Sequence, residues 1–229
     1  MRHEGVLRCL HFDKRTVDFA AHMRRNDGDP VALDETARAL HAALAVVRGH
    51  FLYESGHHGD LWLDLNRLFV DAPRMRGWSA ELARRTQGCR AEVVCGPLIG
   101  GALLAQFVAG ELGAEFVFAE RSAPEADGLH YRLPQSLRRS VKARRVLLVD
   151  DAVNAGSAWR STLAELDECG AQLVGLATLV TLGDAARRCA AQRSVPLHAL
   201  ATLEHGLWAP DDCPLCKLGR PLTYESIRD

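Results

Sequence analysis

Apolar and polar residues follow a regular pattern along the second half of the chain, and the pattern predicts strands and helices in alternation. Apolar runs predict strands at residues 91–95, 115–119, 145–149, 172–181 and 197–203. Amphipathic spacing between these runs predicts helices at residues 99–112, 157–169 and 184–192. Strands that alternate with helices of this length favour an α/β fold, with a central parallel sheet flanked by helices on both faces.

The first half of the chain is less regular. From Asp34 onward, the spacing of Ala37, Leu40, Leu44 and Val47 predicts a helix that ends at Gly49. The stretch HFLYESGHHGDLWLDL (50–65) is strand-like at both ends with a Ser-Gly turn between them, and Ser79 is expected to open a short helix.

These patterns suggest a division of the chain into three parts. Residues 1–31 are charged and irregular, so we expect an N-terminal extension there. Residues 32–206 would form the main domain, including a smaller N-terminal unit at 50–75, and residues 207–229, which contain CPLCKLG, would form a C-terminal appendage.

Composition excludes several classes of protein. The 229 residues are 48% hydrophobic and 25% charged, and the net charge of −1 gives no general attraction to nucleic acid or to an anionic membrane. No apolar run approaches the roughly 20 residues that span a bilayer, and the N-terminus lacks a secretory signal pattern. Seven cysteines, an odd number, indicate reduced thiols. We therefore expect a cytoplasmic protein with neither nucleic acid nor a membrane as partner.

The segment VLLVDDAVNAGSA (146–158) carries the most informative chemistry. Asp150 and Asp151 follow a buried strand, and ligands of open parallel sheets bind at this edge. The small residues after them lead into a helix, whose N-terminal N–H groups and dipole suit a phosphate. The pattern favours a ribose clamp beside a 5′-phosphate site; the alternative is a helix start with two solvated acids.

This segment resembles the signature of the type I phosphoribosyltransferases, and its ending is most similar to the orotate phosphoribosyltransferase version. The resemblance implies that Asp150 and Asp151 hold the ribose hydroxyls of phosphoribosyl pyrophosphate (PRPP). It also implies that five loop residues hold the 5′-phosphate: Asn154, Ala155, Gly156, Ser157 and Ala158.

Two other stretches carry the same resemblance. FLYESGHHGDLWLDL is similar to the family's hood segment over the base, where Phe51, Ser55, Gly56 and Trp62 match. VVCGPLIGGALLA (93–105) resembles the turn that meets pyrophosphate, and its matching positions are Gly96 and Pro97. The resemblance places Gly100 of the same turn among the substrate-binding residues. The implied protein has a type I phosphoribosyltransferase-like fold with a small hood and a mobile loop. It would be a homodimer that uses Mg²⁺ to transfer ribose 5-phosphate from PRPP to a base, orotate first, in pyrimidine nucleotide biosynthesis.

The chain departs from the family in its cations. Four positions where the family has lysines hold Glu54, Gly100, Ser122 and Glu125 here, and Leu182-Gly183 stands where the family has an Asp-Arg pair. Asp127 stands in place of the loop histidine. Arg121 is retained and is the remaining catalytic candidate in the mobile loop.

Residues 130–145 are partly basic and could compensate for the lost cations, or could be a solvated surface loop. The candidates in this run are His130, Arg132, Arg138, Arg139 and Lys142. Two hypotheses therefore stand: an enzyme acting on orotate or another base, and a PRPP- or nucleotide-binding protein with a degenerate catalytic loop.

Cys213 and Cys216 have the spacing of a zinc knuckle, but a structural zinc site needs four ligands. Cys169, Cys189 or His205 could complete such a site, or a second chain could; free thiols are favoured, and no metal ligand is assigned. His57 and His58 are adjacent on an extended segment, so their side chains point to opposite faces and one metal site cannot easily use both. A polar turn is the favoured interpretation of this pair.

Overall fold

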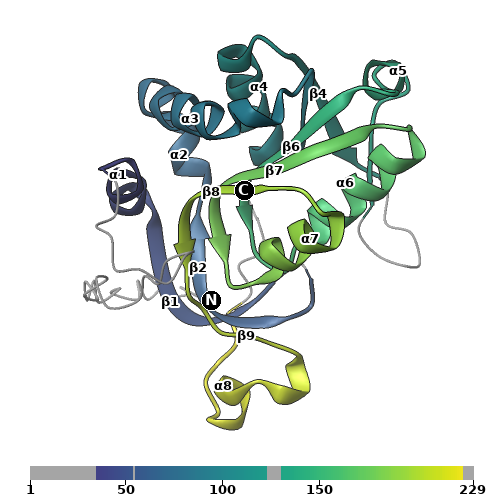
Figure 1. Ribbon diagram of the computed structural model, residues 1–229. Helices are drawn as coiled ribbons and strands as arrows, with labels where there is room; N and C mark the ends of the chain where they lie inside the picture. The colour runs from purple at the N-terminus through teal and green to yellow at the C-terminus, as the bar shows by residue number, and fades with distance from the viewer. Residues whose placement is uncertain (1–34, 54, 123–129, 224–229) are drawn as a thin grey trace, which may run out of the picture.

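A six-stranded sheet forms the centre of the computed structural model, which describes residues 35–53, 55–122 and 130–223 (Figure 1). The strand order is β5-β4-β3-β6-β7-β8, and all neighbours are parallel except the β4–β5 pair. The strands are β3 (Val93–Pro97), β4 (Glu115–Arg121), β5 (Tyr131–Arg132), β6 (Arg145–Val153), β7 (Gln172–Leu182) and β8 (Leu197–Leu203). The predicted α/β fold with a central, mostly parallel sheet is confirmed.

Helices cover both faces of this sheet (Figure 1). On one face lie α1 (Glu35–Ala43), α2 (Asn66–Val70), α3 (Ala72–Thr86) and α4 (Gly100–Leu112). On the other lie α5 (Arg138–Val141), α6 (Ser157–Glu168) and α7 (Ala185–Arg193). Residues of β6 alternate between the two cores: Leu147 and Val149 pack on the first face, Val146 and Leu148 on the second. Both sides of the strand are therefore buried, which explains its continuous apolar run.

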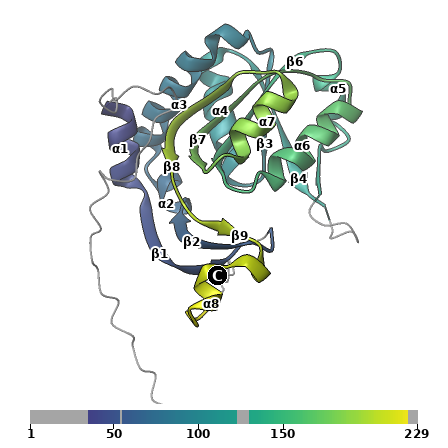
Figure 2. The ribbon, with the colours of Figure 1, turned by 60° about the horizontal axis from the view of Figure 1, so that its bottom comes forward.

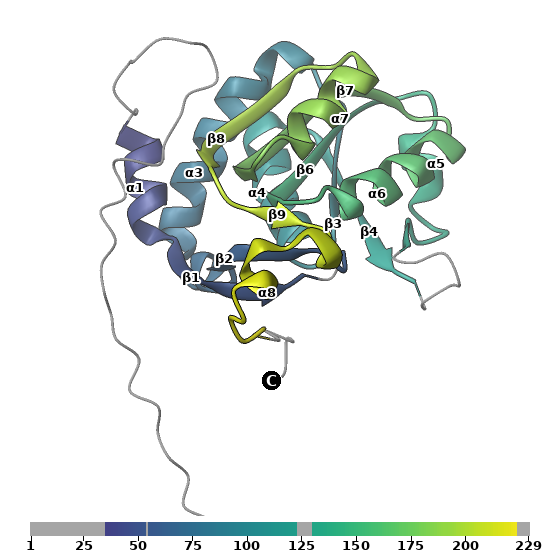
Figure 3. The ribbon, with the colours of Figure 1, turned by 90° about the horizontal axis from the view of Figure 1, so that it is seen from below.

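A second, smaller sheet forms the hood. Its strands are β1 (Ala45–Leu52), β2 (His58–Asp64) and the short β9 (Leu207–Trp208), in the order β1-β2-β9. Figure 2 shows the hood sheet below the main sheet, with α8 (Pro214–Lys217) on its outer side. Figure 3 shows α8 lying over β1 and β2.

The C-terminal segment is thus packed against the hood. Besides the β2–β9 pairing, Thr223 bridges Phe51, and its N–H donates to the carbonyl oxygen of His50 at 2.7 Å. The proposed division at residue 206 stays a prediction, and the proposed extension 1–31 lies outside the described residues, as does Asp34.

Two expectations about local structure were wrong. The first helix ends at Ala43, not Gly49, and Ala45–Leu52 is a strand because its Val46-Val47 pair extends against β2. Ser79 does not open a helix: α3 begins at Ala72, where Asp71 accepts the N–H of Arg74. Ser79 is buried in the middle of α3, and its hydroxyl donates to the carbonyl oxygen of Met75 at 2.7 Å. The side chain is thus bonded within the helix and caps no helix start.

Candidate functional site

The two adjacent carboxylates lie at the carboxyl edge of the main sheet. β6 continues four residues beyond the predicted strand end at 149, so that Asp150 and Ala152 still pair with β7. Asp150 Oδ1 accepts the N–H of Asp151 at 3.1 Å, and Asp151 Oδ1 accepts the N–H of Ala152 at 2.8 Å. These bonds hold both carboxylates at the sheet edge, where a ligand would meet them.

The pair is electrostatically unusual. Asp150 is only 7% exposed, and burial raises its pKa well above the ordinary value, with the neighbouring Asp151 carboxylate adding to the rise. Burial also raises the pKa of Asp151. A buried carboxylate beside a half-buried one, both with raised pKa values, is typical of a functional site, because a bound ligand can supply the missing hydrogen-bond donors or positive charge.

The predicted phosphate loop follows directly. Gly156 has a φ of +74°, a left-handed conformation that glycine adopts without strain, and it precedes the first residue of α6, Ser157. No side chain caps this helix, so its first N–H groups face the loop. Sequence analysis missed Arg160, which donates from Nη1 to the carbonyl oxygen of Ala155 at 2.6 Å and puts a positive charge beside the loop. The sequence signal that could have identified Arg160 was its position one turn after the start of the predicted helix.

A cavity of about 280 Å³ joins this loop to the hood. Its polar side comes from Asp150 and the loop residues Asn154, Ala155, Gly156, Ser157 and Ala158. Its apolar side comes mainly from the hood and β7: Tyr53, Leu61, Trp62, Leu63, Leu65 and Leu182. Ser55 also lines it. The structure therefore brings most of the predicted substrate-binding residues to one cavity.

Aromatic rings form the hood's wall over the cavity. Tyr53 and Trp62 are stacked, with ring centroids 6.5 Å apart and planes inclined by 18°. Burial raises the pKa of Tyr53 to about 12, so its phenol stays protonated and donates to the carbonyl oxygen of Leu61. Phe51, 3% exposed, lies 6.1 Å from Trp62 by ring centroids and packs behind this wall.

The predicted pyrophosphate turn lies directly against the carboxylate pair. A Cβ on Gly96 would lie 2.3 Å from the carbonyl oxygen of Gly101. A Cβ on Gly100 would lie 2.0 Å from Asp151 Oδ2, and one on Gly101 would lie 2.5 Å from Asp150 Oδ1. Pro97 ends β3 just before the turn. The glycines thus allow close approach to both carboxylates, and a side chain at position 100 would require Asp151 to move.

The remaining predicted cations lie elsewhere. Arg121 is the last residue of β4 and pairs with Tyr131, while Glu54, Glu125 and Asp127 lie outside the described residues. Arg132 Nη1 lies 3.1 Å from Oε2 of Glu165, a fully buried carboxylate on α6. Arg138 Nε lies 3.5 Å from Oε1 of Glu165. These two arginines stabilise a buried acid, which argues against their compensating for the lost catalytic lysines.

The residues proposed to complete a zinc site with Cys213 and Cys216 also lie elsewhere. Cys169 contacts Arg138 and Glu165, and Cys189 is a buried residue of α7 that packs in the core. His205 Nε2 lies 2.8 Å from Oδ1 of Asn154, a bond in which the imidazole must donate. Those three assignments were wrong, because the two cysteines fold instead onto the hood beside His50 and His58.

A mostly parallel sheet, two adjacent carboxylates at its carboxyl edge, a glycine-containing loop at a helix start and an aromatic hood together define an α/β protein with a ligand-sized cavity. The family model described as phosphoribosyl transferase domain matches residues 73–195. The orotate phosphoribosyltransferase of Caldanaerobacter subterraneus subsp. tengcongensis is 34% identical over 184 residues, covering 79% of this chain and 90% of the relative. That of Thermotoga maritima is 31% identical over 180 residues, covering 77% and 89%. The chain belongs to the phosphoribosyltransferase family.

Solved structures show the same fold. Orotate phosphoribosyltransferase from Aeropyrum pernix aligns with a TM-score of 0.56 and 24% identity, covering 80% of this chain and 97% of that one. Adenine phosphoribosyltransferase from Rhodothermus marinus aligns with a TM-score of 0.59 and 20% identity, covering 73% and 98%. The predicted type I phosphoribosyltransferase-like fold is therefore confirmed. Within the described residues, no helix combines the length and apolar character needed to cross a membrane.

Proposed function

We propose that this protein is a Mg²⁺-dependent phosphoribosyltransferase that transfers ribose 5-phosphate from PRPP to a base in pyrimidine nucleotide biosynthesis. The observation that carries the proposal is the single cavity that joins Asp150, the loop 154–158 and the aromatic hood. Relatives that are 34% and 31% identical are named orotate phosphoribosyltransferases, which makes orotate the first candidate base.

The residues that line the cavity, and those directly beside it, each have a role in this reaction. Asp150 and Asp151 would accept hydrogen bonds from the ribose hydroxyls, and their negative charge would stabilise the positive charge that develops on the ribose ring. The loop 154–158 and the first N–H groups of α6 would hold the 5′-phosphate, with Arg160 adding charge. The backbone of the turn after Gly96 would face the departing pyrophosphate, and Tyr53 and Trp62 would cover the base and exclude water.

The donor set suits Mg²⁺. The carboxylate oxygens of Asp150 and Asp151 are hard ligands at an open sheet edge, of the kind that binds Mg²⁺ together with substrate phosphates. Mg²⁺ bound with PRPP would neutralise charge on the pyrophosphate. Burial raises the pKa of both acids and thus favours their protonated forms. A cation beside them would offset this effect and favour the ionised forms.

The lining of the cavity favours a second candidate, transfer to a base without a carboxylate. Among the described residues, those lining the cavity include no Lys or Arg, and Leu182 stands near the position where the family's arginine reads orotate. An apolar wall discriminates against a carboxylate, because the charged group would lose its hydration without gaining a partner.

We also propose a homodimer in the cytoplasm. Leu98, Ile99 and Leu103 are 36%, 72% and 41% exposed, and they gather at the turn after β3 and the first turn of α4. A contiguous exposed apolar group of this kind is typical of a contact between protein surfaces. Light scattering at micromolar concentration tests the dimer, and a stable monomer would count against it.

An assay of PRPP consumption tests the function. Orotate, uracil and adenine are each supplied with PRPP and Mg²⁺, and nucleotide formation is followed by chromatography, with Asp150→Ala as the inactive comparison. Nucleotide formation from orotate supports the first candidate, and formation only from uracil or adenine supports the second. Tight PRPP binding by calorimetry without any nucleotide product would instead identify a non-catalytic PRPP-binding protein.

A further inference from the structure

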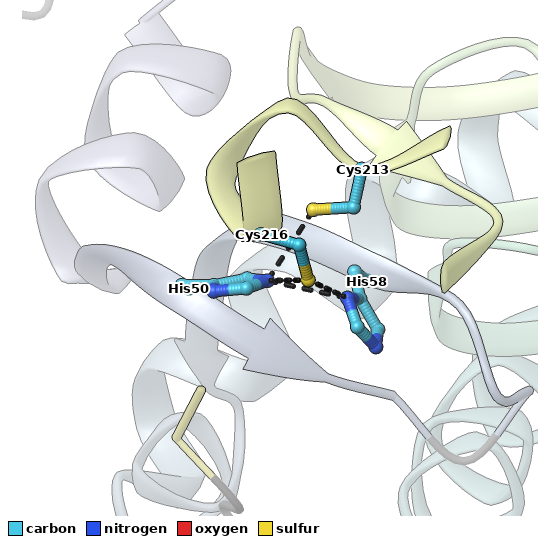
Figure 4. A group of neighbouring side chains, drawn as sticks. All are labelled: His50, His58, Cys213 and Cys216. Atoms are coloured by element: carbon cyan, nitrogen blue, oxygen red, sulfur yellow. Dashed lines mark hydrogen bonds between the residues drawn. The ribbon is translucent and has the colours of Figure 1, made fainter. Parts of the chain in front are cut away.

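Four potential metal ligands converge on the outer side of the hood, away from the cavity. His50 comes from β1, His58 from β2, and Cys213 and Cys216 from the start and body of α8 (Figure 4). Their ligand atoms all lie within 4.8 Å of one another, although 163 residues separate His50 from Cys213. We propose that these four side chains form a structural zinc site that fastens the C-terminal segment to the hood.

The distances match a tetrahedral site. Zn–N bonds of about 2.05 Å and Zn–S bonds of about 2.3 Å place neighbouring ligands about 3.4 Å apart for two nitrogens and about 3.6 Å apart for nitrogen and sulfur. The structure has 3.2 Å between His50 Nε2 and His58 Nδ1. Three of the four nitrogen–sulfur distances are 3.3 Å from His50 to Cys213, 3.7 Å from His50 to Cys216 and 3.3 Å from His58 to Cys216, and the fourth is within 4.8 Å.

Hydrogen bonding alone does not explain this arrangement. His50 Nε2 lies close to His58 Nδ1 and to both sulfur atoms, yet one ring nitrogen carries either a single proton or a single lone pair. His50 Nδ1 lies 3.0 Å from the carbonyl oxygen of Arg220, which can only accept. That bond fixes the proton on Nδ1 and turns the lone pair of Nε2 toward the other ligands, as in known zinc sites.

The ligand types identify the metal and its role. Two thiolates and two neutral imidazoles form a common tetrahedral zinc set, and two thiolate charges balance those of Zn²⁺. His50, His58 and Cys213 are 3%, 7% and 0% exposed, so an uncompensated charge there would be costly. Four protein ligands leave no open coordination position, which makes the site structural rather than catalytic. The six cysteines among the described residues are free thiols, as zinc binding requires.

The position of the site explains what it stabilises. Residues 206–223 contact the hood through β9, through Gly206 N–H bonded to Asp60 Oδ1 at 2.8 Å, and through Thr223. These contacts are few, and α8 is a four-residue helix that could not form alone. Zinc would hold this segment against β1 and β2, and thereby hold Tyr53 and Trp62 over the cavity.

Metal analysis of untagged protein tests the proposal. We expect about one zinc per chain, and Co²⁺ reconstitution should give the thiolate charge-transfer and intense d–d bands of a tetrahedral site. His58→Gln and Cys213→Ser should lose zinc, whereas His57→Gln, altered at the adjacent residue, and Cys216→His, which keeps a ligand, should retain it. Chelation should also accelerate tryptic cleavage after Lys217 in the wild type and leave the rate of that cleavage in His58→Gln unchanged.

Absence of both bound zinc and the Co²⁺ bands in the wild-type protein would overturn the proposal, as would full zinc content in His58→Gln. The wild-type measurements do not depend on whether any variant folds. None of these readouts requires turnover, so their failure is distinguishable from failure of the proposed enzymatic function.

Discussion

Replacing Asp150 by Asn should weaken PRPP binding and at the same time stabilise the ligand-free protein. Asn has the same shape as Asp, and its Oδ1 can keep the 3.1 Å bond from the N–H of Asp151. The substitution therefore replaces a charged acceptor by a neutral amide of the same shape, at a residue that is 7% exposed and lies beside a second carboxylate. A buried like-charged pair costs stability unless a ligand compensates it.

The two effects have estimable sizes. Losing a charged acceptor should cost on the order of 1.5–3 kcal/mol of PRPP affinity, which raises Kd about 10- to 150-fold. Relief of the buried charge, taken as about 1 kcal/mol, should raise Tm by about 2–4 °C in a chain of this size. A variant that was simply misfolded would lose both affinity and stability, so the opposite signs are diagnostic.

The pH dependence gives a third readout. The folded-state pKa of Asp150 lies above its ordinary value of 3.8, so between these pKa values the folded protein holds a proton that the unfolded chain has lost. Wild-type stability should therefore fall as the pH rises from about 4 through the folded pKa, and Asp150→Asn should lack this part of the decline. Scanning calorimetry across this range, with isothermal titration of PRPP, measures all three effects.

Asp167→Asn is the matched control. Asp167 is an exposed carboxylate on α6 that pairs with Arg193 at 2.7 Å, a surface ion pair worth about 0–1 kcal/mol. It should leave the PRPP affinity unchanged and alter Tm little. The assignment of Asp150 as a buried ribose acceptor is refuted if Asp150→Asn binds PRPP as tightly as the wild type, or if its Tm falls.

Three further predictions address other parts of the structure. Glu165→Ala should lower stability by about 3 kcal/mol, less than the loss from breaking a fully buried pair, because the Arg132 side chain reaches water. Arg132→Gln should lower Tm without slowing phosphoribosyl transfer. Slower transfer at an unchanged Tm would instead identify Arg132 as a catalytic cation. Trp62→Ala should raise the KM for the base about tenfold. Tyr53→Phe should keep the ring stack but lose one hydrogen bond, and with it about 1 kcal/mol of stability. The same KM for the base in the two variants would refute an aromatic base site. Leu103→Glu should give a monomer in light scattering, and an unchanged mass would place the dimer contact elsewhere.

The sequence determined the main sheet and its helices because their signal is local. Strand and helix periods are complete within ten residues or so, and caps such as Gly113 mark where helices end. Asp150 and Asp151 could be placed at the sheet edge for the same reason, since a buried strand runs directly into them. Where one residue can serve two local roles, the sequence was ambiguous: Ser79 has the chemistry of a cap but is buried inside α3.

Tertiary structure decided everything that depends on which distant segments meet. Nothing local to Cys213 indicates that β1 and β2 will present His50 and His58 to it, because that contact requires the C-terminal segment to pack on the hood. From the sequence alone, Arg132 likewise looks like a cation available for catalysis. The structure shows that the buried carboxylate of Glu165, on α6, pairs with it. Sequence spacing describes neighbours along the chain. The partners of a buried charge or of a metal ligand depend instead on which strands and helices lie next to each other in the folded structure.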